Sequence, residues 1–322
     1  MLFLGVDSGG TKTAFCLVNA DGSVAACTTA ASAGALDDVE AIAGILAAGV
    51  ATVCDKAGVT ARDIGQAFFG LPGYGESTRV DPVLDELPRH VLGHGRYSCD
   101  NDMVCAWAGS LALADGINVI SGTGSMAYGE RAGSRARAGG WGELFGDEGS
   151  AHWIAVRGLA AFSRMSDGRQ ARGPLHQLLQ RRLGAATELD VLDLVLNQWH
   201  ADRARVAALC PVVAEAASSG DACAAAILED AGAELALVAD AARQRLGFLS
   251  GDVVPVSYSG GVFSVPRVLD AFRRALASGE VGYRLQTPVC PPVVGAALYA
   301  AHRAGAPLAP AAVQRLQRQL VA

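Results

Sequence analysis

The segment from Asp7 to Lys12 holds the first residues that could do chemistry: a carboxylate, two glycines and hydroxyl side chains between two apolar runs. Glycines let backbone N–H groups come close to an anion and point at it. A carboxylate at the tip of a buried strand is costly unless it has a role. The segment therefore predicts a strand–loop–strand hairpin that cradles a phosphate group, with Asp7 directing a metal ion.

A second segment repeats this pattern further along the chain. An apolar run at 117–121 leads into Gly122-Thr123-Gly124-Ser125, and another run follows at 126–130. Recurrence of a whole strand–loop–strand unit is more informative than one glycine-rich loop. It predicts two similar domains whose glycine-rich loops face one cleft.

Two further groups offer side chains suited to an acceptor substrate. Asp100 and Asp102 precede an apolar helix predicted for 103–113, and either could act as its N-cap. The segment 139–150 places five glycines among two aromatic and three acidic residues. Carboxylates accept hydrogen bonds from hydroxyl groups, and an apolar wall suits the face of a sugar ring. These residue types are suited to contact a ligand that carries hydroxyl groups.

Hydrophobic periodicity places these groups on a mixed α/β framework. The first part of the chain is expected to hold strands at 2–6, 13–18, 23–30, 66–71 and 96–99 and helices at 37–58, 79–87 and 103–113. The second part is expected to hold strands at 117–121, 126–130, 253–258 and 284–286 and helices at 151–163, 174–183, 188–199, 203–217, 221–246 and 265–277. A further helix is expected at 294–303.

Composition limits the classes of function. The 322 residues carry a net charge of −6 and are 51% hydrophobic and 18% charged. This balance argues against a duplex nucleic-acid binder and against long disordered segments. The N-terminal apolar run is too short for a signal sequence, and no stretch is suited to cross a bilayer. We therefore expect a soluble, cytoplasmic protein with no nucleic-acid or membrane partner.

The eight cysteines carry no metal-binding signature. No Cys-x-x-Cys pair occurs, and no Cys/His cluster has zinc spacing. Because most of the cysteines lie in apolar segments, we expect buried, reduced thiols. His176, His200 and His302 are expected at the surface.

Four motifs in order resemble the actin-like ATPase and sugar kinase fold: Asp7–Lys12, Asn101-Asp102, Ile120–Ser125 and Ser259–Phe263. The segment Gly139–Ser150 resembles that of the N-acetylglucosamine kinase branch of the BadF/BadG/BcrA/BcrD-type ATPases. The resemblance runs from Gly5 to about Ala300. It implies an α/β fold of two ribonuclease H-like (actin-like ATPase) domains around a central cleft. The expected domains are 1–115, with the C-terminal helix at about 293–322 returning to it, and 116–292.

The resemblance also implies ATP and Mg²⁺ as cofactors. Asp7 would steer Mg²⁺ through water. The implied ATP-binding residues are Gly9, Gly10 and Thr11 in the first loop, Gly122, Thr123 and Gly124 in the second, and Gly220, Gly260 and Gly261 near the adenosine. Lys12 is a further candidate for a phosphate contact, although its loop lacks the G-x-x-x-x-G-K-[ST] pattern and leads into a strand.

For the substrate, the resemblance implies that Asp102 is the general base and contacts an amino sugar, together with Gly139, Gly140, Trp141 and Asp147. Family members carry an Asn in the loop after the third strand. Here that loop reads Ser32-Ala33-Gly34-Ala35, which leaves the identity of the sugar open.

The resulting expectation is an ATP-dependent kinase, and by resemblance a homodimer, that phosphorylates N-acetylglucosamine at the 6-hydroxyl. Glucosamine is the alternative substrate. An ATPase activator of an acyl-CoA dehydratase is disfavoured because the cysteines form no paired motif for an iron–sulfur cluster. A ROK-type kinase is disfavoured because its zinc motif is missing. A non-catalytic sugar or nucleotide sensor is disfavoured by the presence of both Asp7 and Asp102.

Overall fold

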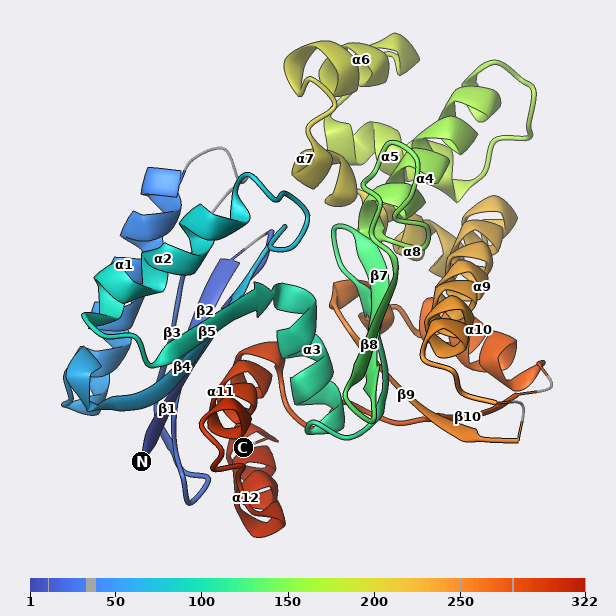
Figure 1. The fold of residues 1–322 in the computed structure, drawn as a ribbon. Helices are drawn as coiled ribbons and strands as arrows, with labels where there is room; N and C mark the ends of the chain where they lie inside the picture. Colours follow the sequence, from blue (N-terminus) through green and yellow to red (C-terminus); the bar gives the residue numbers. More distant parts are fainter. Residues whose placement is uncertain (11, 33–38, 250, 280, 322) are drawn as a thin grey trace. The chain divides into compact units, whose positions relative to one another are not determined.

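The computed structural model describes residues 1–10, 12–32, 39–249, 251–279 and 281–321 (Figure 1). The chain divides into two compact units. Unit 1 comprises Met1–Asp115 and Thr287–Ala322, and unit 2 comprises Gly116–Gln286. We propose these units as the two domains of the protein, with the chain returning to the first at Thr287 rather than at residue 293.

Unit 1 is built on a five-stranded sheet with the order β3-β2-β1-β4-β5. Its strands are β1 (Leu2–Ser8), β2 (Lys12–Asn19), β3 (Val24–Ala31), β4 (Ile64–Leu71) and β5 (Tyr97–Asn101). The first three form an antiparallel meander, whereas β4 runs parallel to β1 and β5 runs parallel to β4. The carboxyl ends of β1, β4 and β5 therefore lie along one edge of the sheet.

Helices cover both faces of this sheet. Successive side chains along a strand point to opposite faces. Phe15 of β2 joins the core that includes residues of helices α1 (Val39–Ala57) and α2 (Asp81–Leu92). Cys16, the next residue, joins a second cluster with residues of α11 (Pro292–Arg303) and α12 (Pro310–Val321). Because both faces are buried, β1 and β2 are apolar along almost their whole length.

Small residues let helix α11 pack very close to its neighbours. A Cβ atom at Gly5 of β1 would lie 2.3 Å from a backbone oxygen of α11. A Cβ atom at Gly295 would lie 2.2 Å from backbone atoms of Cys105 and Gly109 in helix α3 (Asp102–Leu111). Helix α11 therefore packs against both β1 and α3 at distances that only glycine allows.

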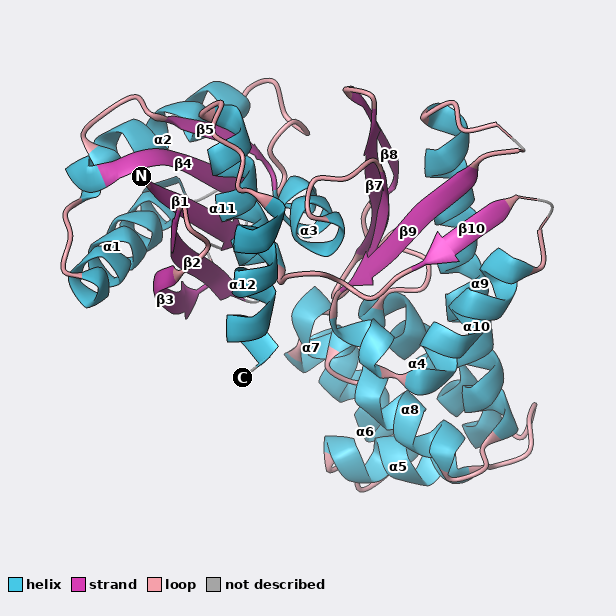
Figure 2. Ribbon diagram, turned by 90° about the horizontal axis from the view of Figure 1, so that it is seen from below, coloured by secondary structure: helices cyan, strands magenta, loops and turns pink. Residues whose placement is uncertain are grey.

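Unit 2 has a sheet with the order β10-β9-β6-β7-β8. Its strands are β6 (Gly116–Ser121), β7 (Ser125–Arg131), β8 (Ser134–Gly139), β9 (Val253–Ser259) and β10 (Gly282–Leu285). Strands β6, β7 and β8 form an antiparallel meander, while β9 runs parallel to β6 and β10 to β9. Strand for strand this is the arrangement of unit 1, so the predicted α/β class and its repeat are confirmed (Figure 2, strands in magenta).

The helices of unit 2 are α4 (Ala151–Ser166), α5 (Pro174–Leu183), α6 (Glu188–Leu192), α7 (Arg203–Ala207), α8 (Cys210–Ser218), α9 (Ala222–Arg245) and α10 (Pro266–Ala277). Their apolar side chains form one core with the sheet, in which Ile117 and Val256 meet Ile154, Leu235 and Phe272. Within the described ranges, no helix combines the length and apolar character that a membrane crossing requires.

Some sequence expectations for unit 2 were wrong. The helix expected at 188–199 is α6 followed by a π-helix at Asp193–Gln198. The helix expected at 203–217 is divided into α7 and α8. Pro211, in the first turn of α8, has no backbone N–H and so cannot donate the hydrogen bond that would continue α7. His176, expected at the surface, is only 3% exposed because its ring stacks on Phe162 at 4.6 Å.

Replacing Gly295 by Ala is expected to destabilise the protein. The added methyl group has no space against the backbone of α3, and such overpacking typically costs about 1–3 kcal/mol. Gly44→Ala is the matched control, because Gly44 lies in α1 with nothing within 4 Å of its Cβ position. In an exposed helix that exchange is expected to stabilise by up to about 1 kcal/mol. Equal thermal denaturation midpoints for the two variants would contradict the close packing of α11.

Candidate functional site

Two carboxylates come together at the carboxyl edge of the unit 1 sheet. Asp7 lies near the end of β1, paired with Ala14 of β2 and Gly70 of β4. The pKa of Asp7 is raised to about 7, chiefly because burial disfavours its charge and also because the negative charge of Asp102 is close. The positive charge of Lys12 partly opposes this shift. An arrangement of this kind favours a bound cation, which would relieve the repulsion.

Asp102 owes its position to its neighbour in the chain. Asn101 is the N-cap of α3, and its side-chain oxygen accepts a hydrogen bond from the Met103 N–H at 3.2 Å. The side-chain amide of Asn101 also donates to the Tyr74 carbonyl oxygen at 3.0 Å. The expectation that Asp100 or Asp102 caps this helix was therefore wrong. Asn101 is therefore the cap, and Asp102 is the first residue of the helix.

Gly70 is a site residue that the sequence reasoning missed. A Cβ atom at Gly70 would lie 2.2 Å from the Cys105 sulfur and 3.1 Å from the Cα atom of Asp102. Only glycine therefore lets the start of α3 lie directly against β4. A glycine inside a predicted strand is a signal of close approach, and here it marks the place where Asp102 meets the sheet.

The first glycine-rich loop closes the β1–β2 hairpin. The Gly9 N–H donates to the Lys12 carbonyl oxygen at 3.0 Å, and the Ser32 hydroxyl donates to the Gly9 carbonyl oxygen at 2.9 Å. The N–H of Gly9 is thus already used by the hairpin. Gly10 and Lys12 are exposed, as a contact with a phosphate group requires. Thr11 and residues 33–35 of the expected sugar loop lie outside the described residues.

The second glycine-rich loop, between β6 and β7, is held by the start of helix α4. The Ala151 N–H donates to the Gly122 carbonyl oxygen at 2.8 Å, and the His152 N–H donates to the Thr123 carbonyl oxygen at 3.4 Å. Within the loop, the Gly122 N–H donates to the Gly124 carbonyl oxygen at 2.9 Å. These bonds fix the backbone of the loop in one conformation before any ligand binds.

Gly260 brings the end of β9 against this second loop. Its φ of +98° lies in a region that other residues rarely adopt. A Cβ atom there would lie 2.2 Å from the Ser121 carbonyl oxygen and 3.0 Å from the Gly122 nitrogen. Gly261 follows, exposed, at the start of a short 3₁₀ helix. Open α/β sheets bind ligands at the carboxyl ends of adjacent parallel strands, and β6 and β9 form such a pair.

Gly220 has a structural explanation in the connection between α8 and α9. Its φ is +88°, and it precedes Asp221, the N-cap of α9. The buried Asp221 carboxylate accepts hydrogen bonds from the N–H groups of Leu175 and Ala224 at 2.8 and 3.0 Å. Gly220 therefore lets the chain reverse between two packed helices, and its expected role in ATP binding stays a prediction.

The segment 139–150 brings Asp147 against the second loop. Gly139 and Gly140 have left-handed φ values of +73° and +71°, and Asp147, only 3% exposed, has a φ of +56°. A Cβ atom at Gly124 would lie 2.7 Å from Oδ2 of Asp147. Trp141, by contrast, is 68% exposed. Within unit 2, the structure therefore brings the expected sugar-binding carboxylate, but not the Trp141 ring, into contact with the expected phosphate loop.

Arg203 is the partner of Asp147 and was also missed. Its Nη2 donates to Oδ2 of Asp147 at 2.5 Å, and its Nε lies 3.2 Å from Oε2 of Glu143. Burial raises the pKa of Asp147, while Arg203 and backbone hydrogen bonds from Ser125 and Gly142 lower it. Arg203 begins α7, and no pattern in the sequence connects it with a residue so far upstream.

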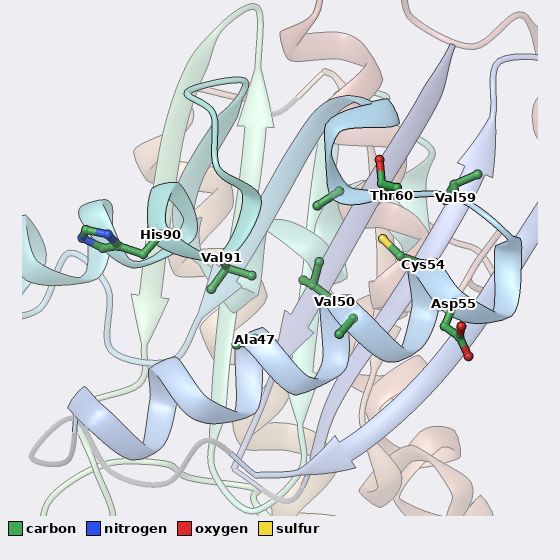
Figure 3. A pocket seen from close by; sticks show the side chains of 10 residues that line it. Ala47, Val50, Cys54, Asp55, Val59, Thr60, His90 and Val91 are labelled. Atoms are coloured by element: carbon green, nitrogen blue, oxygen red, sulfur yellow. The ribbon is translucent and has the colours of Figure 1, made fainter.

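Unit 1 also contains a hollow of about 570 Å³ (Figure 3). Val50, Cys54 and Asp55 of α1 line it with Thr60 and His90. The lining residues 59–61 precede the first residue of β4, so the hollow lies toward the amino ends of the parallel strands, opposite Asp7. Because it lies at the other end of these strands, the hollow has no evident part in the candidate site. Across the described residues, no group of three or more His, Cys, Asp or Glu side chains could hold a metal ion.

Comparisons with known proteins point to one family. The model of the BadF/BadG/BcrA/BcrD ATPase family matches residues 4–300. An N-acetyl-D-glucosamine kinase of Dictyostelium discoideum is 28% identical over 320 residues, which cover 93% of this chain and 97% of that protein. An N-acetylmuramic acid/N-acetylglucosamine kinase of Clostridium acetobutylicum is 29% identical over 222 residues, 69% of this chain and 72% of the relative.

Solved structures show the same fold. A Chromobacterium violaceum protein provisionally assigned as an N-acetylglucosamine kinase is 26% identical, with a TM-score of 0.74 over 92% of this chain and 98% of that one. A ROK family glucokinase from Streptomyces griseus, solved with glucose and AMPPNP, is 19% identical, with a TM-score of 0.58 over 94% of this chain and 100% of that one. The predicted sugar kinase fold is thereby confirmed.

Replacing Asp7 by Asn is expected to raise thermal stability at pH 8 in the absence of divalent cations, because a buried charge and its repulsion from Asp102 are removed. The folded-state pKa of about 7 lies above the ordinary value of 3.8, so the destabilisation grows with pH between these values and is constant above. The gain in melting temperature should be full above about pH 7 and absent below about pH 4. Asp21→Asn is the control. Hydrogen bonds from Ser23 lower the pKa of the Asp21 carboxyl, so this exchange is expected to lower the melting temperature rather than raise it. A gain independent of pH would contradict the repulsion.

Replacing Arg203 by Ala is expected to lower stability by about 1–3 kcal/mol, the usual cost of leaving a buried polar group without its partner. Asp147→Asn added to this variant should restore part of the loss, because the unpaired charge is then gone. Arg205→Ala, at an exposed position on the same helix, serves as the control. Thermal denaturation of the four proteins checks this, and a double variant no more stable than Arg203→Ala would rule out the ion pair as the cause.

Proposed function

Because the chain belongs to the BadF/BadG/BcrA/BcrD ATPase family, we propose that it is an ATP-dependent kinase that phosphorylates an amino sugar, N-acetylglucosamine at the 6-hydroxyl. Support comes from both curated relatives, whose names include N-acetylglucosamine kinase, and from the family match over nearly the whole chain. Glucosamine is the alternative acceptor.

The single observation that carries the proposal is the pair Asp7 and Asp102, held close at the end of β1 and the start of α3. Transfer of a phosphoryl group needs alignment and charge neutralisation more than covalent chemistry. We assign Asp102 as the general base that accepts the proton of the sugar hydroxyl. We assign Asp7 as the residue that holds Mg²⁺ through water.

The donor set at Asp7 fits Mg²⁺, which prefers carboxylate oxygens and keeps several waters. When bound, Mg²⁺ would supply positive charge to the ATP phosphates. The raised pKa of Asp7 gives this assignment a physical basis, because a cation would favour the ionised carboxylate. Gly10 and Lys12, both exposed at the turn after β1, would contact the same phosphates. We also propose Gly9 and Thr11 as phosphate-binding residues of this loop.

In unit 2 we assign the backbone of Gly122, Thr123 and Gly124 to phosphate binding, and Gly260 and Gly261 to the adenosine. Asp147 would accept a hydrogen bond from a sugar hydroxyl, supported by its contact with Gly124. The sugar then competes with Arg203 for that carboxylate. Gly139, Gly140 and Trp141 complete the proposed sugar-binding segment, and the backbone of Trp141 matters more than its exposed ring.

The acceptor is tested by coupled ADP release with purified protein, Mg-ATP and a panel of N-acetylglucosamine, glucosamine, N-acetylmuramic acid, N-acetylmannosamine and glucose. We expect the highest kcat/KM for N-acetylglucosamine and only a small rate without sugar. A higher kcat/KM for glucosamine would identify glucosamine as the preferred substrate. ADP release that does not depend on sugar would favour the ATPase-activator function, and no release with any sugar would favour a sensor.

Asp102→Asn is expected to lower kcat by roughly 10²–10⁴-fold, the usual contribution of a general base, with little change in the KM for ATP. Asp100→Asn makes the same exchange two residues earlier, at the end of β5, and is expected to retain most activity. If both variants keep wild-type kcat with the best sugar, Asp102 is not the base.

A further inference from the structure

Cys16 and Cys27 face each other across strands β2 and β3. They are direct partners in the antiparallel ladder, so both side chains point to the same face of the sheet. Direct partners in such a ladder have Cα atoms about 4.5–5.5 Å apart, inside the range of about 4.4–6.8 Å that a disulfide requires. Each thiol also lies close enough to shift the pKa of the other. The Cα separation of the pair therefore suits a disulfide.

The two thiols have different environments. Cys16 is fully buried and packs in the cluster that holds Cys290, Val294 and Leu298. Cys27 is exposed, contrary to the expectation that the cysteines are buried. One sulfur of the pair can therefore meet a small reagent from solvent, while the other can be reached only through its partner.

Electrostatics assigns a role to each thiol. The side-chain interaction with Cys16 lowers the pKa of Cys27, and the Lys56 ammonium contributes to the same shift. Lys56 lies at the edge of β3, since its Nζ donates to the carbonyl oxygen of Cys27 at 3.4 Å. The same interaction between the thiols, together with burial, raises the pKa of Cys16. Cys27 is thus the more acidic and more accessible thiol of the pair, and we assign it as the nucleophile.

We propose that Cys16 and Cys27 form a peroxide-oxidisable dithiol, a modification site independent of the kinase activity. The Cys27 thiolate attacks a peroxide oxygen, an S–O bond forms, the O–O bond breaks, and the other oxygen leaves as hydroxide or alkoxide. The Cys16 sulfur then attacks the Cys27 sulfenic acid. An S–S bond forms, and the hydroxyl leaves as water with the Cys16 proton. Two electrons pass from the dithiol to the peroxide, and a thiol reductant reverses the reaction.

The partner thiol limits the damage that an oxidant can do. An exposed thiolate alone would continue from sulfenic to sulfinic acid, which thiols do not reverse. Cys16 intercepts the sulfenic acid before a second peroxide arrives. Cys54, Cys99, Cys105, Cys210 and Cys290 have their pKa values raised by burial, so they are expected to react more slowly than Cys27.

The experiment treats the reduced full-length protein with hydrogen peroxide, blocks remaining thiols with N-ethylmaleimide and maps the cysteines by mass spectrometry. Digestion with trypsin alone would leave Cys16, Cys27 and Cys54 in one peptide, because no Lys or Arg lies between Lys12 and Lys56. A second protease that cuts before aspartate separates the first two at Asp21 and releases Cys54 from them. We expect a linked pair of peptides that has lost two hydrogens and that separates on reduction.

Variants assign the order of events. In Cys16→Ser, Cys27 should be trapped by dimedone as a sulfenic acid and then accumulate as sulfinic acid. In Cys27→Ser, the link should be lost and Cys16 should stay unmodified. Cys223→Ser, which changes a partly exposed cysteine of α9, should leave the link intact. In the wild-type protein, a sulfinic acid at Cys27 without a link, a link between other cysteines, or an unreacted Cys27 would each overturn the proposal.

Discussion

Repulsion between two carboxylates, Asp7 and Asp102, is the interaction around which unit 1 is arranged. In the unfolded chain, water separates the two carboxylates and their repulsion disappears. Other contacts in the folded protein must therefore hold them together. The parallel pairing of β1 with β4 fixes Asp7. Gly70 and the Asn101 cap fix the start of α3 against the same edge. Helix α11 packs on both β1 and α3 so closely that only glycine fits at the contacts, and it holds the two elements in place.

Unit 2 builds its proposed phosphate loop from backbone contacts rather than from charge. The loop after β6 is tied by hydrogen bonds to the start of α4, and Gly260 comes within backbone contact of it. The charged groups nearby, Asp147 and Arg203, are paired with each other. Their pairing stabilises the segment 139–150 against the loop, because a lone buried charge would be far more costly. The two units thus have the same sheet topology but place their ionisable groups under opposite electrostatic conditions.

The elements of the fold could be predicted from sequence because each leaves a local pattern. The hairpins at Asp7–Lys12 and Gly122–Ser125 carry apolar runs on both sides of a glycine-rich turn, and the same pattern gives the same sheet twice. The site was less accessible, because its contacts are not local. Nothing near Arg203 indicates Asp147, and the burial of His176 depends on a ring from another helix. Asn101 was overlooked as a cap because two aspartates flank it, although Asn caps helices as well as Asp.

The return of the chain to unit 1 has a consequence for synthesis at the ribosome. The strand that carries Asp7 is made before any part of unit 2, but the face of β1 at Gly5 is covered by α11, which is made after all of unit 2. Unit 2 is continuous and has all its strands before Thr287 emerges. Unit 1 therefore begins before unit 2 and is completed after it, and the face of its nascent sheet that α11 covers stays bare until α11 has been made.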